Sequence, residues 1–332
     1  MKITLSVIVV NYNGKKFLPR LFESIFRQSF NNFEVILVDN SSRDDSVKFT
    51  NRKCPKIRVF IKKNAGYGSA CNFGALKAKG EYLVFINEDM YFPQDFLSSM
   101  YSFYQQIDDK TKIGGIGCKM VDFDKDPSKM PKKYGGQIDI FGFSINKFYK
   151  NDIFIISGSP FFISKSVFRQ IKGFNESIFL YGEDVDLSWR LKILGYNNYM
   201  NHDTYLHHFG GGASGGFGPT KIAQNLCVSL IPMYTNYSVL TLIFILPFYC
   251  LYILLMSLAL LIIKRNVRYL SEIFKLIYKF FHDYQKIHHL RMFVQENRVY
   301  SDSHIYKYVS LIPAFIFNSS YKKLSKNYKI VN

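Results

Sequence analysis

The most chemically suggestive residues are three carboxylates at the start of a predicted helix. Glu183, Asp184 and Asp186 lead into an apolar repeat that begins at Leu187, and Gly195 follows as a helix stop, so the acids occupy the first turn. An acid there stabilises a helix by about 0.3–1 kcal/mol through capping and the helix dipole, and this role suffices for Asp186. One cap does not require three carboxylates. We therefore take Asp184 as a candidate catalytic residue.

A second acidic motif, Asn87-Glu88-Asp89, follows the apolar run Tyr82–Ile86. The length and aromatic, β-branched content of that run predict a buried strand. In open α/β sheets the ligand crevice lies outside the carboxyl ends of the strands. Mg²⁺ or Mn²⁺ is commonly held by one or two carboxylates plus substrate phosphate oxygens, and this motif offers that minimum. The alternative is a solvated turn.

The elements that would position these groups alternate between strand and helix. This alternation predicts an α/β fold of βαβ units with a mainly parallel, twisted sheet and flanking helices, whose first half is a Rossmann-like nucleotide-binding unit. The predicted strands are Leu5–Val10, Glu34–Val38, Arg58–Ile61, Tyr82–Ile86, Ile113–Met120 and Phe154–Ile163, with a helix from about Lys16 to Gln28.

Two further strand-end segments carry residues suited to a nucleotide. Asp39 could accept from a base imide or a ribose hydroxyl. The turn Asn64-Ala65-Gly66-Tyr67-Gly68 would let backbone approach a phosphate. The Gly-x-Gly alone is weak evidence, because it lacks the third glycine and the early position of a dinucleotide fingerprint.

Together these segments resemble the family 2 glycosyltransferases of the GT-A fold, specifically the rhamnosyltransferase-like branch that builds bacterial surface polysaccharides. The resemblance covers about Ser6 to Ser214. It rests on an ordered set of motifs: VIVVNYNG, VDNSS, NAGYGSACNFG, INED, ISGSPFFISKSVFRQIKGFNE, FLYGEDVDLSWRLKILGY and the HH pair with its glycine-rich sequel.

The resemblance implies roles at matching positions. Asp89 matches the last Asp of the metal-binding DxD-like motif, Asp184 the proposed general base, and His207 a downstream metal ligand, so the cofactor would be Mn²⁺ or Mg²⁺. The sequence departs from the pattern at Asn87, where the usual motif has Asp, and at Glu88, where the branch often has Pro. The implied nucleotide-sugar site comprises Val10, Tyr12, Asp39, Asn64, Gly66, Asn72, Asn87 and Glu183.

The resemblance thus implies an inverting, metal-dependent glycosyltransferase. It would move a hexosyl or deoxyhexosyl group from a nucleoside-diphosphate sugar to a polyprenyl-linked or growing surface polysaccharide of O-antigen or capsule type. Two alternatives stay open: a sugar nucleotidyltransferase, and a non-catalytic membrane-associated protein that binds nucleotide or saccharide. Donor sugar, base, acceptor, linkage and oligomeric state are not identified by the sequence.

Two features near the HH pair have competing interpretations. His207 is a metal ligand by resemblance, whereas a His at a strand end is commonly a hydrogen-bonded structural residue. The segment Gly210–Gly216 is either a lid over bound nucleotide or a plain linker. Trp189, the only Trp, is expected to pack in the helix.

An apolar segment follows, without a charged residue from Ile222 to Ile263. Val239–Ile263 is long enough to span about 30 Å of hydrocarbon. A single span would place the basic C-terminus opposite the catalytic domain, against the positive-inside tendency. A re-entrant or interfacial arrangement is therefore favoured, and a buried helical pair is the alternative.

Beyond Lys264 the sequence predicts a basic amphipathic helix. Apolar residues such as Ile273 and Phe281 recur at helical spacing with Lys275 and Lys279 between them, which suits an anionic membrane surface. The alternative is that this helix packs against a partner protein. The end of the chain, Asn318–Asn332, is predicted to be disordered.

These shifts in composition divide the chain into three parts. Residues 1–218 form the predicted catalytic domain, with a nucleotide-sugar half at 1–110 and an acceptor half at 111–218. Residues 219–263 form the apolar membrane-associated segment, and residues 264–332 form the basic amphipathic helix and tail.

Charge and cysteine usage bound the setting. The net charge of +18 favours anionic partners. Nucleic acid is not expected, because the N-terminal part shows no recognition motif or basic helix. The first predicted strand begins by Leu5, which leaves no room for a secretory signal. The cytoplasmic face of the bacterial inner membrane is the predicted location, with reduced thiols. The scattered cysteines are Cys54, Cys71, Cys118, Cys227 and Cys250.

Overall fold

A computed structural model describes residues 3–123, 125–127, 135–147, 152–156, 158–209 and 218–310 of the chain. The predicted lid or linker at Gly210–Gly216 and the predicted disordered tail at Asn318–Asn332 lie outside the described residues.

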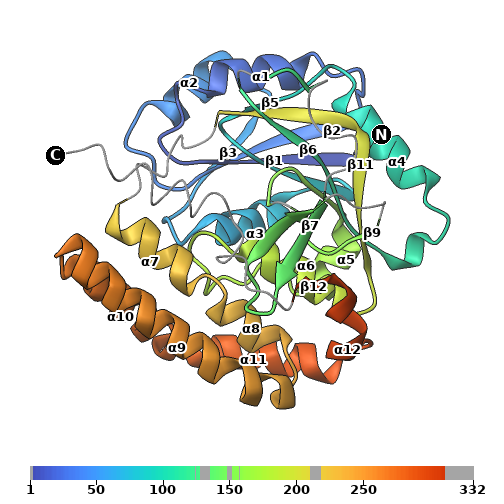
Figure 1. The fold of residues 1–332 in the computed structure, drawn as a ribbon. Coiled ribbons are helices and arrows are strands. Elements are labelled where there is room, and N and C mark those ends of the chain that lie inside the picture. The colour runs from blue at the N-terminus through green and yellow to red at the C-terminus, as the bar shows by residue number, and fades with distance from the viewer. Residues whose placement is uncertain are drawn as a thin grey trace.

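A curved central sheet runs through the molecule (Figure 1). Within the described residues its strands are β1 Leu5–Asn11, β2 Phe33–Asp39, β3 Arg58–Ile61, β4 Tyr82–Asn87, β5 Met90–Tyr91, β6 Ile113–Asp122, β9 Asp152–Ile153, β10 Phe161–Ser164 and β11 Asn197–His208. Their order is β3-β2-β1-β4-β10-β6-β11-β5, and β9 pairs with β11. The first four strands are parallel, and β10 runs antiparallel to both of its neighbours. The predicted α/β sheet is therefore confirmed.

Helices cover both faces of this sheet. They are α1 Leu18–Phe26, α2 Ser46–Lys53, α3 Tyr67–Lys77, α4 Phe96–Gln106, α5 Lys165–Gln170 and α6 Glu183–Ile193. Alternate residues of β1 serve the two faces: Val7 and Val9 pack in one core with α1 and α4, and Ile8 and Val10 pack in the other with α3, α5 and α6. A strand buried on both sides reads as a continuous apolar run, and for that reason the sequence located it well.

One predicted strand is much shorter than expected. The run Phe154–Ile163 was predicted as a single strand, but only its end, in β10, pairs with the central strands. Pro160 interrupts the run before Phe161, and a proline has no N–H to give to a sheet ladder. The interruption brings Gly158 and Ser159 out of the sheet, beside the start of α6.

The start of α6 corrects the role assigned to Asp186. Gly182, in the left-handed conformation at φ 82°, is the residue that precedes the helix, and no side chain caps it. Asp186 lies in the first turn as predicted, but it is fully buried and forms an ion pair with Arg190 at 2.8 Å. Gly195, at φ 94°, lies just past the helix end as predicted. Trp189 is fully buried, which confirms its packing role.

The C-terminal part is helical and packs against the sheet domain beside α6 (Figure 1). Its helices are α7 Pro219–Cys227, α8 Leu230–Asn236, α9 Val239–Lys264, α10 Arg268–His282, α11 Tyr284–Glu296 and α12 Asp302–Ile305. A small second sheet lies next to them, formed by β12 Val309–Ser310, β7 Gly135–Asp139 and β8 Ser144–Lys147. Among the described residues one helix, α9, is long and apolar enough to cross a membrane.

Candidate active site

A cavity of about 530 Å³ opens at the carboxyl ends of β1 and β4, and we call it the strand-end cavity. Its walls come from both of those strand ends, from the turn before α3, from the segment before α6 and from α7. The lining residues are Val10, Tyr12, Asn40, Asn64, Gly66, Tyr67, Asn87, Glu88, Asp89, Phe179, Leu180, Tyr181, His208 and Lys221. The predicted ligand crevice at the strand ends therefore exists in the folded chain.

A second cavity of about 360 Å³, the carboxylate cavity, contains Glu183 and Asp184. It is bounded by the start of α6, by the Gly158–Ser159 turn and by Val228 after α7. The two cavities share five lining residues: Tyr67, Asn87, Leu180, Tyr181 and His208. A ligand in the strand-end cavity and one in the carboxylate cavity would therefore meet at these residues. The fold brings together the two acidic motifs, which are far apart in the sequence.

Asp89 is paired with His208 at this junction. Nε2 of His208 lies 3.3 Å from Oδ2 of Asp89, and the Asp89 carboxylate is buried. His207, the predicted metal ligand, instead stacks on the ring of Tyr91 at 4.6 Å between centroids. Adjacent residues of a strand point to opposite faces, so only one member of the HH pair can face Asp89. The structure places His208 there, so we take His208 as the candidate ligand beside Asp89, and the ligand role of His207 stays a prediction.

The groups at the junction fit a hard divalent cation. Asp89 offers carboxylate oxygen, a ligand type suited to Mg²⁺ and Mn²⁺, and His208 offers an imidazole nitrogen beside it. Asn87 adds a buried Oδ1 atom without a hydrogen-bond partner, on the boundary of both cavities. Within the described residues no group of three or more His, Cys, Asp or Glu side chains forms a protein-only metal cage. Such sparse ligation is typical of ions that take their remaining ligands from substrate phosphates.

Glu88 lies beside Asp89 on the strand-end cavity and is buried. Burial and the neighbouring Asp89 charge raise the pKa of Glu88 to about 8. Its side chain packs over Gly14, where a Cβ atom would lie 2.3 Å from the Glu88 Cγ. The motif Asn11-Tyr12-Asn13-Gly14 is thus shaped to let a carboxyl side chain lie against the end of β1.

Asp184 is held by backbone N–H groups while remaining partly exposed. Gly158 donates to its Oδ2 atom at 2.9 Å and Val185 to its Oδ1 atom at 2.9 Å. Burial raises the pKa of Asp184 despite these two bonds, and burial together with the Asp184 charge raises the pKa of Glu183 to about 8. Each Asp184 oxygen keeps a second lone pair. This side chain can therefore accept a proton from a group in the carboxylate cavity.

The turn before α3 is pressed against the segment before α6. Gly66 adopts φ 100°, and a Cβ atom there would lie 2.2 Å from the carbonyl oxygen of Phe179. Tyr67 donates its N–H to the same oxygen at 3.2 Å, and its hydroxyl donates to the carbonyl of Gly158 at 3.1 Å. A glycine is required here by both space and conformation. Tyr67 links the walls of the two cavities.

Besides His207, two predicted site residues, Asp39 and Asn72, line neither cavity. Asp39 is buried at the end of β2, and its Oδ1 atom accepts from Asn11 at 2.7 Å and from Ser42 at 2.6 Å. Asn72 donates to the carbonyl of Phe174 at 2.9 Å and so ties α3 to the chain before α6. In the free protein both side chains serve to hold the walls of the site.

The sequence did not single out every polar residue of the cavities, and Asn40, His208 and Lys221 are instructive examples. Asn40 follows Asp39 at the same strand end, where the alternation of a strand could have signalled it. His208 was available as the other half of the HH pair. Lys221 lies in the segment read only as apolar, yet it reaches the strand-end cavity from α7. The sequence signal for Lys221 is its positive charge, which stands immediately before the uncharged segment Ile222–Ile263.

Comparison with known proteins agrees with this geometry. The family model described as "Glycosyl transferase family 2" matches residues 6–172 of the 332 in the chain. The chain belongs to glycosyl transferase family 2. The matched region includes the Asn87–Asp89 motif and ends before α6. The rhamnosyltransferase-like branch is not singled out by the match.

Curated relatives of this family 2 protein are glycosyltransferases by name. An uncharacterized glycosyltransferase of Rickettsia typhi is 27% identical over 209 residues, which is 60% of this chain and 62% of the relative. Glycosyltransferase GlyG of Streptococcus pneumoniae is 32% identical over 118 residues, covering 34% of this chain and 39% of that protein. The chain spans 62% of the length of the Rickettsia typhi relative.

Solved structures share the fold of this family 2 protein. GalNAc-T7, determined with UDP, GalNAc and Mn²⁺, matches with a TM-score of 0.56 at 14% identity, over 70% of this chain and 48% of that one. A fragment of S. aureus TarS matches with a TM-score of 0.50 at 17% identity, over 70% of this chain and 66% of that one. At these identities the likeness shows the GT-A arrangement of sheet and helices.

Proposed function

We propose that the protein is an inverting glycosyltransferase that moves a sugar from a nucleoside diphosphate to a saccharide acceptor. The observation that carries the proposal is the meeting of the two cavities at Asn87 and His208. One cavity lies at the parallel strand ends, where nucleotides bind in open α/β sheets. The other contains the carboxylate of Asp184. Two substrates are needed for transfer, and the two adjoining cavities support this proposal.

In the proposed reaction, Asp184 takes the proton of the acceptor hydroxyl, and the acceptor oxygen forms the new glycosidic bond. The Asp184 carboxylate accepts the proton of an acceptor hydroxyl while that oxygen attacks the anomeric carbon. The bond between this carbon and the diphosphate oxygen breaks, and its electron pair stays on the diphosphate. Attack from the face opposite the leaving group inverts the anomeric centre. A positioned general base typically contributes about 10²–10⁴-fold to the rate.

The charge of the leaving diphosphate is offset at the other end of the site. Mn²⁺ or Mg²⁺ held by Asp89 and His208 would supply positive charge next to it. Lys221 lines the same cavity and offers a second positive charge from α7. The similar structures of TarS with UDP and of GalNAc-T7 with UDP and Mn²⁺ support a nucleoside-diphosphate sugar as donor.

The acceptor and the place of action extend this proposal. We infer a polyprenyl-linked or growing surface polysaccharide of O-antigen or capsule type, handled at the cytoplasmic face of the bacterial inner membrane. The basis is the resemblance to the rhamnosyltransferase-like branch, together with the apolar α9 and the basic α10. Nucleotide sugars are made in the cytoplasm, so the donor cavity would face that side.

Donor binding is tested by thermal unfolding of the full chain with a panel of nucleotide sugars, with and without Mn²⁺. A ligand at 100 times its Kd adds about 2.7 kcal/mol of stability. We expect one nucleotide sugar to raise Tm in a metal-dependent way, and Asp89→Ala to abolish the shift. Asp108→Ala, which removes an exposed carboxylate outside both cavities, should keep it. If every nucleotide sugar leaves Tm unchanged with and without metal, the proposal is wrong.

A further inference from the structure

One face of α9 is apolar and exposed from end to end. Six large side chains on it recur at alternating spacings of four and three residues, so they form one stripe along the helix. They are 46–74% exposed. The stripe consists of Phe244, Phe248, Leu251, Leu255, Leu258 and Ile262.

The opposite face of α9 is packed on the protein from Leu242 to Ser257. Tyr249 donates its hydroxyl to the carbonyl of Leu226 in α7 at 2.7 Å. Tyr249 and Tyr252 pack on the ring of Phe141, with centroids at 5.6 and 6.0 Å. Further along, Ser257 is buried as well. α9 is therefore not a free rod joined to the domain by its end.

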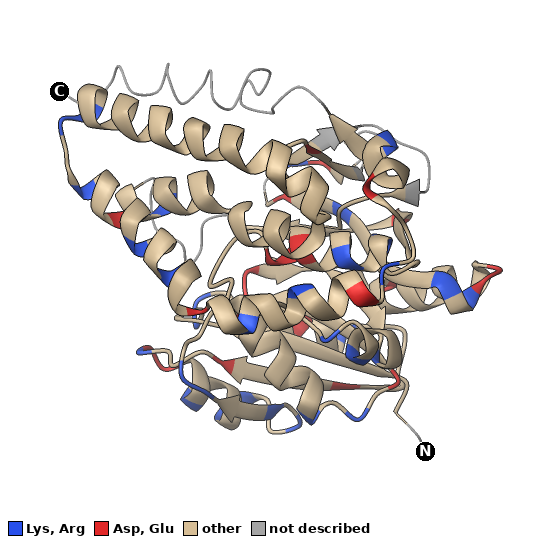
Figure 2. Ribbon diagram, turned by 90° about the horizontal axis from the view of Figure 1, so that it is seen from below, with Lys and Arg blue, Asp and Glu red and all other residues tan. Residues whose placement is uncertain are grey.

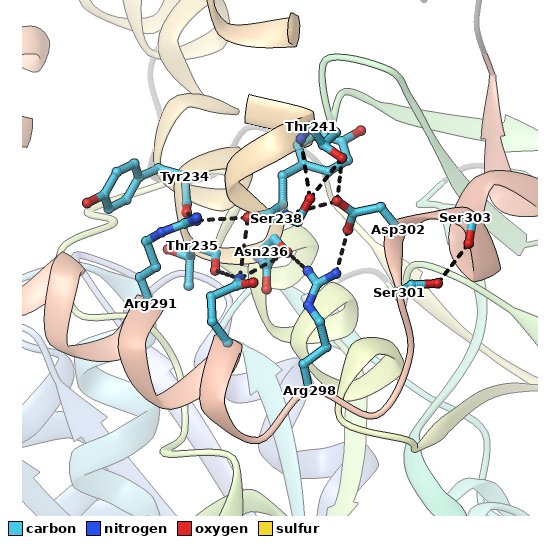
Figure 3. Close-up of polar contacts among 12 residues, drawn as sticks. Tyr234, Thr235, Asn236, Ser238, Thr241, Arg291, Arg298, Ser301, Asp302 and Ser303 are labelled. Atoms are coloured by element: carbon cyan, nitrogen blue, oxygen red, sulfur yellow. Dashed lines mark hydrogen bonds and ion pairs between the residues drawn. The ribbon is translucent and has the colours of Figure 1, made fainter. Parts of the chain in front are cut away.

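The beginning of α9 is fixed by a polar cluster (Figure 3). Asp302 accepts the N–H of Ser238 at 2.9 Å and the hydroxyl of Thr241 at 2.6 Å, and it pairs with Arg298 at 2.7 Å. A helix that crossed a bilayer would draw these polar groups and the packed domain into hydrocarbon. Irregular backbone exposed to lipid does not occur within the hydrocarbon region, so this placement is unfavourable. The contacts favour a helix that lies along a surface.

α10 has an exposed apolar face of its own and adds positive charge. Its exposed side chains Phe274, Tyr278 and Phe281 again follow a spacing of four and three. In Figure 2, α9 carries no charged residue before its last turn, where Lys264 begins a group of Lys and Arg at the turn that leads into α10. Arg265 and Arg268 are exposed in this region. Residues 239–296 contain seven Lys or Arg and three Asp or Glu, a net charge of +4.

We propose that α9 and α10 seat the protein on an anionic phospholipid surface, with α9 lying in the plane of the interface rather than crossing the bilayer. An apolar face flanked by Lys and Arg is the pattern of interfacial helices, which sink about 5–10 Å into the headgroup region. A lone exposed apolar residue needs no explanation, but a continuous stripe does. The positive charge selects a lipid surface over a second copy of the same basic chain. The inference does not depend on the catalytic residues.

Binding is tested by co-sedimentation of the full chain with vesicles of phosphatidylcholine, with and without phosphatidylglycerol. We expect strong binding only with the anionic lipid, weakened by salt, and about fivefold weaker for each of Arg265→Ala and Arg268→Ala. Phe244→Glu/Phe248→Glu should lower binding at least tenfold. The matched control, Ile61→Glu/Leu76→Glu, changes side chains that are 64% and 73% exposed in β3 and α3 and should bind as wild type does.

The orientation of α9 relative to the membrane is tested by quenching of tryptophan fluorescence with brominated lipids. Trp189 is the only Trp and is buried, so an added Trp reports its own depth. Equal quenching of Leu240→Trp, Leu251→Trp and Ile262→Trp is expected for a helix in the interface. Deepest quenching at the central position would show a crossing helix. Unchanged vesicle binding by Phe244→Glu/Phe248→Glu, or a wild-type dimer that ignores vesicles, would overturn the proposal.

Discussion

Nε2 of His208 lies 3.3 Å from Oδ2 of Asp89, at the boundary between the strand-end cavity and the carboxylate cavity. These cavities are the candidate donor site and the candidate acceptor site. The His208–Asp89 pair links the end of β11 to the turn between β4 and β5. β11 and β5 are antiparallel neighbours, with His208 opposite Met90. His207 cannot occupy this place, because its ring lies on Tyr91. The metal-dependent part of the proposed chemistry thus depends on the second His of the HH pair.

Replacement of His208 should weaken metal-dependent donor binding. We expect His208→Ala to lower the apparent affinity for Mn²⁺ about 10- to 100-fold, the range found for groups that ligate or orient a metal ligand. The measurement is the Mn²⁺ dependence of the Tm shift produced by the stabilising nucleotide sugar. His207→Ala is the matched control and should leave that dependence in place. The reverse pattern would restore His207 as the ligand.

Glu183 should make the protein less stable as pH rises. Its pKa is raised from 4.5 to about 8 by burial and by Asp184, so between these values the folded state holds a proton that the unfolded state has released. The free energy of unfolding then falls with increasing pH, by about 1 kcal/mol per pH unit. Chemical unfolding from pH 5 to 8 should show this fall in wild type and a flatter curve in Glu183→Gln. Parallel curves would refute the shift.

A side chain at position 66 should damage the donor cavity. Gly66→Ala places a Cβ atom 2.2 Å from the Phe179 carbonyl oxygen and imposes a φ of 100° on a non-glycine residue, a strain of about 1–3 kcal/mol. We expect a lower Tm and a weaker response to the nucleotide sugar. Gly218→Ala is the control, because no atom lies within 4 Å of its Cβ position. Equal behaviour of the two variants would contradict the close approach.

The buried pair Asp186–Arg190 should be structural. Both side chains are fully buried, and Asp186 also accepts from Asn236 of α8 at 3.1 Å. Asp186→Asn leaves the Arg190 charge without its partner and should cost about 3–5 kcal/mol of unfolding free energy. Asp45→Asn, in an exposed pair with Lys15, should change stability little. Denaturant midpoints give both values, and a small loss in Asp186→Asn would support a mere capping role.

The sequence located the parts of the fold whose pattern is local. The two-sided burial of β1 and β4 produces unbroken apolar runs, and Gly195 marks the end of α6 through its positive φ. The carboxylates of Asp89 and Asp184 were found because acids at the end of a buried strand and in excess at a helix start are costly unless used. These sequence patterns are local, and they can be recognised without knowing which residues are in contact in the folded protein.

What the sequence could not give depends on pairing across long distances. The choice between His207 and His208 is set by the register of β11 against β5, and a shift of one residue would exchange them. The burial of Asp186 arises from Arg190 and from Asn236 in α8. Lys221 reaches the strand-end cavity only because α7 folds back over it. None of these contacts produces a periodic pattern in the sequence.

The central claim is that Asp184 is the general base of a glycosyl transfer. Its most direct test is nucleoside diphosphate release from the stabilising nucleotide sugar, measured with a lipid-linked saccharide acceptor for wild type and Asp184→Asn. The account predicts acceptor-dependent release by wild type and a rate about 10²–10⁴-fold lower in the variant. The variant should still show the donor-induced Tm shift, since Asp184 does not line the strand-end cavity. Turnover near the wild-type rate in Asp184→Asn would contradict it.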